Sequence, residues 1–305
     1  MRVQISAAPG TWGVESPCDP ANPPWRRLLS EIADIGFEGT ELGPLGYLPD
    51  TSDVLARELA SRSLSLVAGF LMEPFHEPAR RGAIVEVAER TCRLLRDAGA
   101  RRLVLMEALV PSRMSGAGRS DEAPRLDDAR WRRMVAAVEE VVHVAVGHGL
   151  QTTFHPHAGT YVEFVDEIEH LMADLDDAIG LCLDTGHCVY AGIDPVEMLC
   201  TYGSRVRHLH VKDADEDVLA RCLADGMGFA DAVAAGVFCA LGRGDVDFGA
   251  FCEGLRAIGY EGWATVEQDR LPNAGRPRVD AEASLEHLRR VGIASRSLVV
   301  GGGSS

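Results

Sequence analysis

Long apolar runs are missing from this 305-residue sequence. No window approaches the roughly 18 uncharged apolar residues that a membrane-spanning helix requires, so we expect no part of the chain to cross a membrane. The first thirteen residues, MRVQISAAPGTWG, contain one arginine and no extended apolar stretch. They indicate a first strand rather than a secretory signal peptide. We therefore expect a cytoplasmic protein.

Positive charge is scarce, because 30 Lys and Arg stand against 46 Asp and Glu, for a formal net charge of −16. Such an acidic chain repels phosphate backbones and anionic lipid, so we expect no nucleic-acid or membrane partner. Paired cysteine motifs are also missing, since none of the eight cysteines forms a CxxC pattern. This spacing favours reduced, mostly buried thiols over disulfides or a cysteine metal site.

Four common functional motifs do not occur in the sequence. The chain has no GxGxxG or GxxxxGK[ST] loop to bind a nucleotide phosphate. It has no GxSxG turn to present a serine nucleophile, which argues against an α/β-hydrolase. It also lacks the HExxH pattern of zinc proteases.

Short apolar segments alternate with longer amphipathic ones along most of the chain. The amphipathic segments with helical spacing include 24–35, 127–148, 162–175 and 248–258. The expected strands are 2–7, 37–42, 64–70, 102–107, 151–155, 179–184, 206–212 and 262–267. Eight strand–helix units predict a single (β/α)8 TIM barrel over residues 1–295, with a doubly wound open sheet as the rival. We expect residues 296–305, which include GGGSS, to form a flexible tail.

Two connections are longer than a turn, and both follow expected strands. Residues 111–124 are rich in Gly, Ser and Arg, and residues 214–238 contain an additional helical pattern. In a barrel, both would lie at the C-terminal face, where active sites form. We expect 214–238 to be an inserted helical segment that covers the site, with an interface of a homo-oligomer as the alternative.

The last four expected strands each end in acidic or imidazole side chains. The residues at these ends are His155 and His157, Asp184 and His187, His208, His210 and Lys212, and Glu267 and Asp269. Taken singly, each has a simpler explanation, such as a structural histidine or, for Asp184, a helix cap. Together, they would converge at one barrel mouth, where a divalent cation would relieve the repulsion among carboxylates and the cost of burying them.

Three residues near the earlier strands could also contribute to such a site. Glu41 and Glu107 end strands and could act as an acid, a base or a hydroxyl-binding group, although a salt bridge in the barrel mouth is equally consistent. Trp12 follows the first strand and could form a wall for a sugar-like ring, or simply pack in the core. We carry Glu41 forward as a candidate catalytic residue and Glu107 and Trp12 as candidate substrate-binding residues.

Several of these motifs resemble the xylose isomerase-like TIM-barrel superfamily. They are FHPHAGTYVE at 154–163, LDTGHCVYAG at 183–192, RHLHVKD at 207–213, LGRGDVDF at 241–248, VEQD at 266–269 and GTELGPLGYLP at 39–49. Within the superfamily, they are most similar to the inosose (2-keto-myo-inositol) dehydratase subgroup. The DTGH and HLH pieces are shared widely, whereas HPHAGT is narrower.

The resemblance implies one divalent ion, held at the ends of strands five to eight. The matching positions are His155, Asp184, His210 and Glu267, and His155 stands where the epimerases of this fold usually have a glutamate. That departure favours a dehydratase over a two-base epimerase. Mn²⁺ or Co²⁺ is the ion that the resemblance implies, whereas the ligand types alone equally admit Zn²⁺ or Fe²⁺.

The implied reaction is removal of water from a 2-keto-cyclitol through an enolate. Candidate acids and bases are His157, Lys212, Glu41 and His187, and His187 also matches a substrate-contacting position. The alternatives are a ketose or inosose isomerase or epimerase, β-elimination from a 3-keto-glycoside, and a non-catalytic sugar-binding barrel. His155 lies nearer the strand than His157, and both can point to the same side. We therefore expect His155 to bind the metal and His157 to face the substrate.

Overall fold

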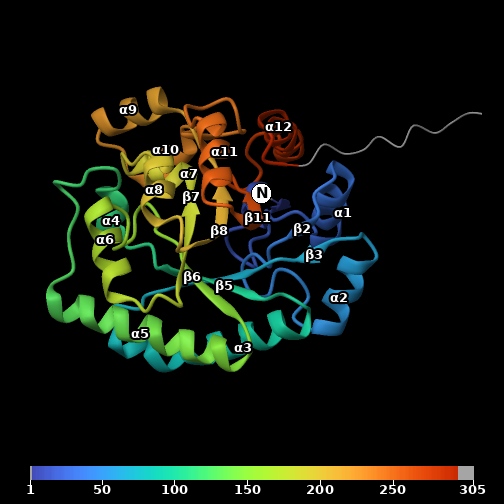
Figure 1. Cartoon of the computed structure of the whole chain (residues 1–305), viewed down its shortest axis with the longest axis horizontal. Helices are drawn as coiled ribbons and strands as arrows, with labels where there is room; N and C mark the ends of the chain where they lie inside the picture. The colour runs from blue at the N-terminus through green and yellow to red at the C-terminus, as the bar shows by residue number, and fades with distance from the viewer. Residues whose placement is uncertain (1, 295–305) are drawn as a thin grey trace, which may run out of the picture.

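The computed structural model describes residues 2–294, which form a barrel of parallel strands surrounded by helices (Figure 1). The nine strands of its main sheet pair in the order β3-β2-β1-β11-β8-β7-β6-β5-β4. β3 (Ser65–Leu66) and β4 (Gly69–Glu73) stand at the two ends of this order, yet only residues 67 and 68 separate them in the chain. They are therefore two parts of one strand that closes the ring. The prediction of a (β/α)8 barrel is confirmed.

The remaining strands lie where the apolar segments predict them. β1 and β5 begin and end at the predicted residues, and β2 is shorter than predicted. The strands are β1 (Arg2–Ala7), β2 (Gly39–Thr40), β5 (Arg102–Glu107), β6 (Gln151–Phe154), β7 (Gly180–Asp184), β8 (Val206–Val211) and β11 (Glu261–Val266). All pairs in this sheet are parallel, so every strand ends at the same mouth of the barrel.

Helices form the outer layer. The four amphipathic segments are α1 (Trp25–Ile35), α5 (Asp128–Gly147), α6 (Val165–Asp174) and α11 (Phe248–Ala257). The other surrounding elements are the short 3₁₀ helices η1 (Pro9–Trp12) and η2 (Pro78–Arg80), and α2 (Ser52–Ala60), α3 (Arg81–Asp97), α7 (Thr185–Tyr190), α8 (Pro195–Tyr202) and α12 (Pro277–Val291). α1 ends at Gly36, whose φ of 99° is a left-handed conformation that favours glycine.

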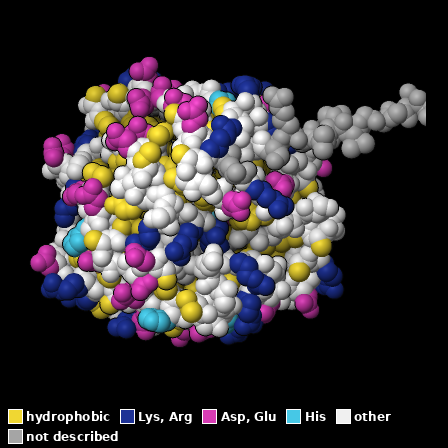
Figure 2. Space-filling model, viewed as in Figure 1, with side chains coloured by type: hydrophobic (Ala, Val, Ile, Leu, Met, Phe, Trp, Pro, Cys, Tyr) yellow, Lys and Arg dark blue, Asp and Glu magenta, His cyan; other side chains and the backbone are white. Residues whose placement is uncertain are grey.

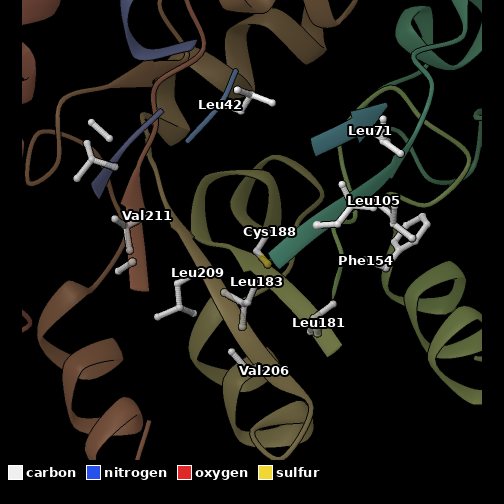
Figure 3. Close-up of a cluster of buried hydrophobic side chains, with 14 of the residues drawn as sticks. Leu42, Leu71, Leu105, Phe154, Leu181, Leu183, Cys188, Val206, Leu209 and Val211 are labelled. Atoms are coloured by element: carbon white, nitrogen blue, oxygen red, sulfur yellow. The ribbon is translucent and has the colours of Figure 1, made fainter. Parts of the chain in front are cut away.

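Alternate strand residues point to opposite sides of the barrel wall. One set, which includes Leu105, Leu183 and Leu209, belongs to the large apolar cluster between strands and helices (Figure 3). The other set fills the barrel interior, where Val104 and Cys182 form a small separate apolar cluster. The predicted polar residues of β7 and β8 share this interior parity.

The two long connections both contain helices. Residues 111–124 begin with α4 (Pro111–Ser115). The segment after β8 contains α9 (Glu216–Ala224) and α10 (Phe229–Ala234) between two short antiparallel strands, β9 (Asp213–Ala214) and β10 (Phe238–Cys239). The Asp213 carboxylate fixes the base of this segment, because it accepts hydrogen bonds from the backbone N–H groups of Gly242, Gly244 and Val246.

Several sequence-based expectations concern the surface and the ends of the chain. No helix among residues 2–294 has the length and apolar character needed to span a bilayer. Acidic and basic side chains are interspersed on the face shown in Figure 2. All eight cysteines are free thiols, and Cys18 and Cys200 are exposed. The predicted flexible tail at 296–305 lies outside the described residues.

Candidate metal centre and active site

Four side chains from consecutive strand ends meet at the barrel mouth. His155 follows β6, Asp184 ends β7, His210 lies in β8 and Glu267 follows β11. Each offers one ligand atom, and these four atoms all lie within 4.8 Å of one another. His155, Asp184 and His210 are no more than 2% exposed. The structure therefore brings together all four residues that the sequence assigns to a metal.

Three ligand atoms of this group, His155 Nε2, Asp184 Oδ2 and His210 Nδ1, are buried without a hydrogen-bond partner among the described residues. The other polar atom of each side chain is engaged. His155 Nδ1 donates to the carbonyl of Pro156 at 2.6 Å, and Asp184 Oδ1 accepts from the N–H groups of Gly186 and His187. These contacts orient the free lone pairs toward one another.

The distances between these free atoms call for a cation. His210 Nδ1 lies 2.9 Å from Glu267 Oε2, and His155 Nε2 lies 3.5 Å from Asp184 Oδ2. Lone pairs this close repel each other unless a positive charge lies near them. Lys212 Nζ, 3.3 Å from Asp184 Oδ2 and from Glu267 Oε2, supplies such a charge to the two carboxylates, and a metal ion would supply it to all four ligand atoms. A mixed set of imidazole nitrogens and carboxylate oxygens suits a divalent transition metal. The residues present therefore fit one such ion.

Glu41 contacts His210 and fixes the orientation of its ring. Its Oε1 accepts hydrogen bonds from His210 Nε2 at 3.0 Å, His208 Nε2 at 2.7 Å and Thr265 Oγ1 at 2.8 Å. Burial alone would raise the pKa of the Glu41 carboxyl, but the two histidines outweigh it and hold this pKa well below its usual range. With its Nε2 proton bound to Glu41, His210 has the lone pair of Nδ1 free for a ligand.

Lys212 is the only lysine in the chain and is fully buried in the site. Its Nζ lies 2.9 Å from both Asp269 Oδ1 and His187 Nε2, and 3.3 Å from an oxygen of Asp184 and of Glu267. Burial opposes the charge, but the three carboxylates raise the pKa of Lys212 well above its ordinary value. Lys212 is therefore an ammonium that can donate protons in hydrogen bonds.

Gly186 explains why this ammonium reaches the site. A Cβ at this position would come within 2.5 Å of Lys212 Cγ and 2.8 Å of its Cβ. Contacts this short do not occur between carbon atoms, so the glycine of the DTGH motif leaves room for the lysine stem. The same motif thus supplies a ligand, Asp184, and the space for Lys212.

His157 and His187 form a second pair, further out than the ligands. Their ring centroids lie 3.8 Å apart. His157 Nδ1 donates to the carbonyl of Ala158, which leaves the lone pair of Nε2 free. Burial, followed by nearby His155 and Lys212, lowers the pKa of His157 to about 3, so its ring is neutral.

The segment after β8 covers this pair. The Phe229 ring of α10 lies 5.5 Å from the His157 ring, and Phe238 lies 5.4 Å from His187. Arg119, in the other long connection, donates to the carbonyls of Leu223 and Met227. The two long connections are therefore joined to one another by these hydrogen bonds.

A cavity of about 80 Å³ adjoins the metal group. His157, Glu267 and Asp269 line one part of it, and Met72 and Met106 contribute apolar surface. The sequence prediction gave Asp269 no role, although its spacing of two from Glu267 placed both on one face of the strand end. It also missed Glu15, another lining residue, because the loop after η1 has no periodic pattern.

Two predicted substrate-binding residues, Glu107 and Trp12, do not line this cavity. Glu107 lies on the helix-facing side of β5, because Val104 and Met106 take the interior positions, and its Oε1 bonds to His76 Nδ1 at 2.6 Å. Trp12 turns away from the cavity, and its Nε1 donates to Glu31 of α1 at 2.8 Å. Both side chains are instead buried in structural contacts.

Comparison with known proteins agrees with this geometry. The sequence matches the family described as xylose isomerase-like TIM barrel over residues 29–291. A rhizopine catabolism protein, MocC, of Rhizobium meliloti is 32% identical over 296 residues, covering 97% of this chain and 90% of that protein. An inosose dehydratase of Geobacillus kaustophilus is 31% identical over 274 residues, covering 87% and 86%.

Solved structures support the fold. The IolI protein with a bound zinc atom has a TM-score of 0.70 at 16% identity, covering 95% of this chain and 98% of that one. A probable 3-DHS dehydratase, AsbF, of Bacillus anthracis has a TM-score of 0.72 at 14% identity, covering 94% and 98%. The chain is therefore an enzyme, and it belongs to the xylose isomerase-like TIM barrel family.

Proposed function

We propose that this enzyme is a metal-dependent hydro-lyase that removes water from a 2-keto-cyclitol such as inosose. The observation that carries the proposal is the convergence of His155, Asp184, His210 and Glu267, with three buried ligand atoms that have no hydrogen-bond partner among the described residues. The similarity to inosose dehydratases over most of both chains supports the substrate class.

Four residues would hold the ion, and Mn²⁺ or Co²⁺ is the ion we propose, with Zn²⁺ or Fe²⁺ also compatible with the ligand types. When bound, a divalent ion there supplies Lewis acidity that stabilises the negative charge of an enolate. Glu41 keeps His210 in the orientation that this binding needs. Glu41 thus acts through His210 and is a positioning residue rather than a base.

The remaining polar groups would bind the substrate and move protons. Lys212, as an ammonium, would donate a hydrogen bond to an oxygen that gains negative charge. His157 presents a free Nε2 lone pair to the cavity and would accept the proton removed from the carbon next to the ketone. His187 contacts Lys212 and would help to bind a substrate hydroxyl.

The proposal is tested by incubating the protein with 2-keto-myo-inositol and with a panel of ketoses, in chelator and after adding Mn²⁺, Co²⁺ or Zn²⁺. Mass spectrometry should detect a product lighter by one water molecule, formed only with a metal. A product of unchanged mass would instead support an isomerase or epimerase. Absence of any conversion across the panel would favour a sugar-binding barrel.

A further inference from the structure

Glu15 lines the cavity beside the metal group. It lies in the loop between η1 and α1, whereas His155 follows β6 and His210 lies in β8. Glu15 follows η1 and the turn at Gly13, whose φ of 76° is left-handed. A Cβ at Gly10 would lie 3.6 Å from Glu15 Oε1 and 3.4 Å from Glu267 Oε1. Both carboxyl groups therefore lie near Gly10, in the wall of the cavity that they share.

The other ionisable groups that line this cavity have a role or a partner already described, and His157 is the proposed base. His210 and Glu267 belong to the metal group, and Glu41 accepts three hydrogen bonds. Asp269 Oδ1 accepts from Lys212, and Asp269 Oδ2, which has no hydrogen-bond partner among the described residues, lies 3.4 Å from His187 Nε2. Glu15 lines the same cavity, and among residues 2–294 its carboxyl group has no hydrogen-bond or ion-pair partner.

We propose that Glu15 is a catalytic acid, which gives a proton to the hydroxyl group that leaves the substrate. This role rests on the proposed dehydration. The base takes the proton from the carbon next to the ketone, and the electron pair of that C–H bond forms the enolate. The C–O bond at the next carbon then breaks, and the Glu15 proton joins the departing oxygen to form water. One proton is lost to the base and one is supplied by the acid, so the substrate loses one H₂O overall.

The surroundings of Glu15 suit an acid. Burial of its carboxyl group, followed by the charges of Asp269 and Glu267, raises its pKa to about 8, against the opposing effect of Lys212. This direction favours a protonated carboxyl group in the metal-free protein, in line with its place in the cavity wall. The residue as a whole is exposed at the rim of the cavity. Solvent can thus return the proton after each turnover.

The test uses two substrates that differ in their leaving group. One is 2-keto-myo-inositol, and the other is its analogue with fluorine in place of the departing hydroxyl, because fluoride leaves without taking a proton from an acid. Glu15→Gln keeps the shape of the side chain and removes the proton. We expect it to slow water loss by about 10²–10⁴-fold and to leave fluoride release near the wild-type rate, with metal content unchanged.

Glu122→Gln is the matched control, because Glu122 is exposed and has no side-chain partner among the described residues. It should release both water and fluoride at wild-type rates. Water loss by Glu15→Gln at the wild-type rate would refute the role of Glu15 alone. An equal loss of both reactions would also refute it, because that pattern indicates a binding or structural role. If the wild-type enzyme itself releases no water from inosose, the proposed function fails and the role of Glu15 fails with it.

Discussion

Replacing Glu41 with glutamine tests whether the buried network beneath the metal group controls metal affinity. In the structure, one oxygen of Glu41 accepts from His208, His210 and Thr265, all within 3.0 Å. An uncharged amide weakens these charge-assisted bonds and allows His210 to rotate. Loss of a partner that orients a metal-bound histidine lowers metal affinity by about 10–100-fold. Because the donors are buried, we also expect a loss of about 1–3 kcal/mol in the free energy of unfolding.

Glu107→Gln provides a matched control for this experiment. Glu107 is also fully buried at a strand end and also bonds to a histidine, His76, but on the outer side of the barrel wall. The Glu107→Gln variant should lower the melting temperature of the metal-free protein and leave metal affinity unchanged. Affinity is measured by competition with a chromophoric chelator for Co²⁺ or Zn²⁺. Wild-type affinity in Glu41→Gln, or an equal loss in Glu107→Gln, would refute the positioning role of Glu41.

Further predictions concern His155 and His157, the position of Lys212, and the segment 214–238. His155→Ala should lose metal and activity together, whereas His157→Ala should keep the metal and lose mainly turnover; metal analysis showing the reverse would invert the assignment. Gly186→Ala should displace Lys212, so amine-reactive labelling read by mass spectrometry should find this single lysine reactive in the variant and protected in the wild type. Because the pKa of His157 is lowered to about 3 from the ordinary value of 6.5, the unfolded chain binds a proton below about pH 6.5 that the folded chain does not. Stability of the metal-free protein should therefore fall by about 1.4 kcal/mol per pH unit as the pH drops from about 6.5 toward 3, and His157→Gln should remove this contribution from thermal unfolding curves. Arg119→Ala should loosen the segment 214–238 and reduce turnover with little change in melting temperature; dissociation of an oligomer with unchanged turnover would instead support the interface alternative.

The fold was predictable because each strand carries a short apolar run with turn residues on both sides. β1 and β5 match the predicted bounds for this reason. The third strand was less regular, because its chain pairs with β2 through Ser65 and Leu66 and with β5 only from Gly69. Apolar content alone does not reveal such a break in pairing.

The site was predictable where residues alternate along a strand and not where they lie in loops. His208, His210 and Lys212 share one side of β8 and its end, and all three point into the barrel. Glu107 lies on the other side of its strand, away from the cavity, and this parity was readable from the apolar Met106 before it. Glu15 lies in an irregular loop, so only the folded chain shows that it reaches the cavity.

A crystal grown with Mn²⁺ shows through the anomalous signal of the metal whether four strand-end residues hold one divalent ion. We expect one strong peak bounded by His155 Nε2, Asp184 Oδ2, His210 Nδ1 and a carboxylate oxygen of Glu267, at bonding distances of about 2.0–2.3 Å. No peak at this position, or a peak elsewhere that leaves these four atoms without an ion, would contradict this expectation.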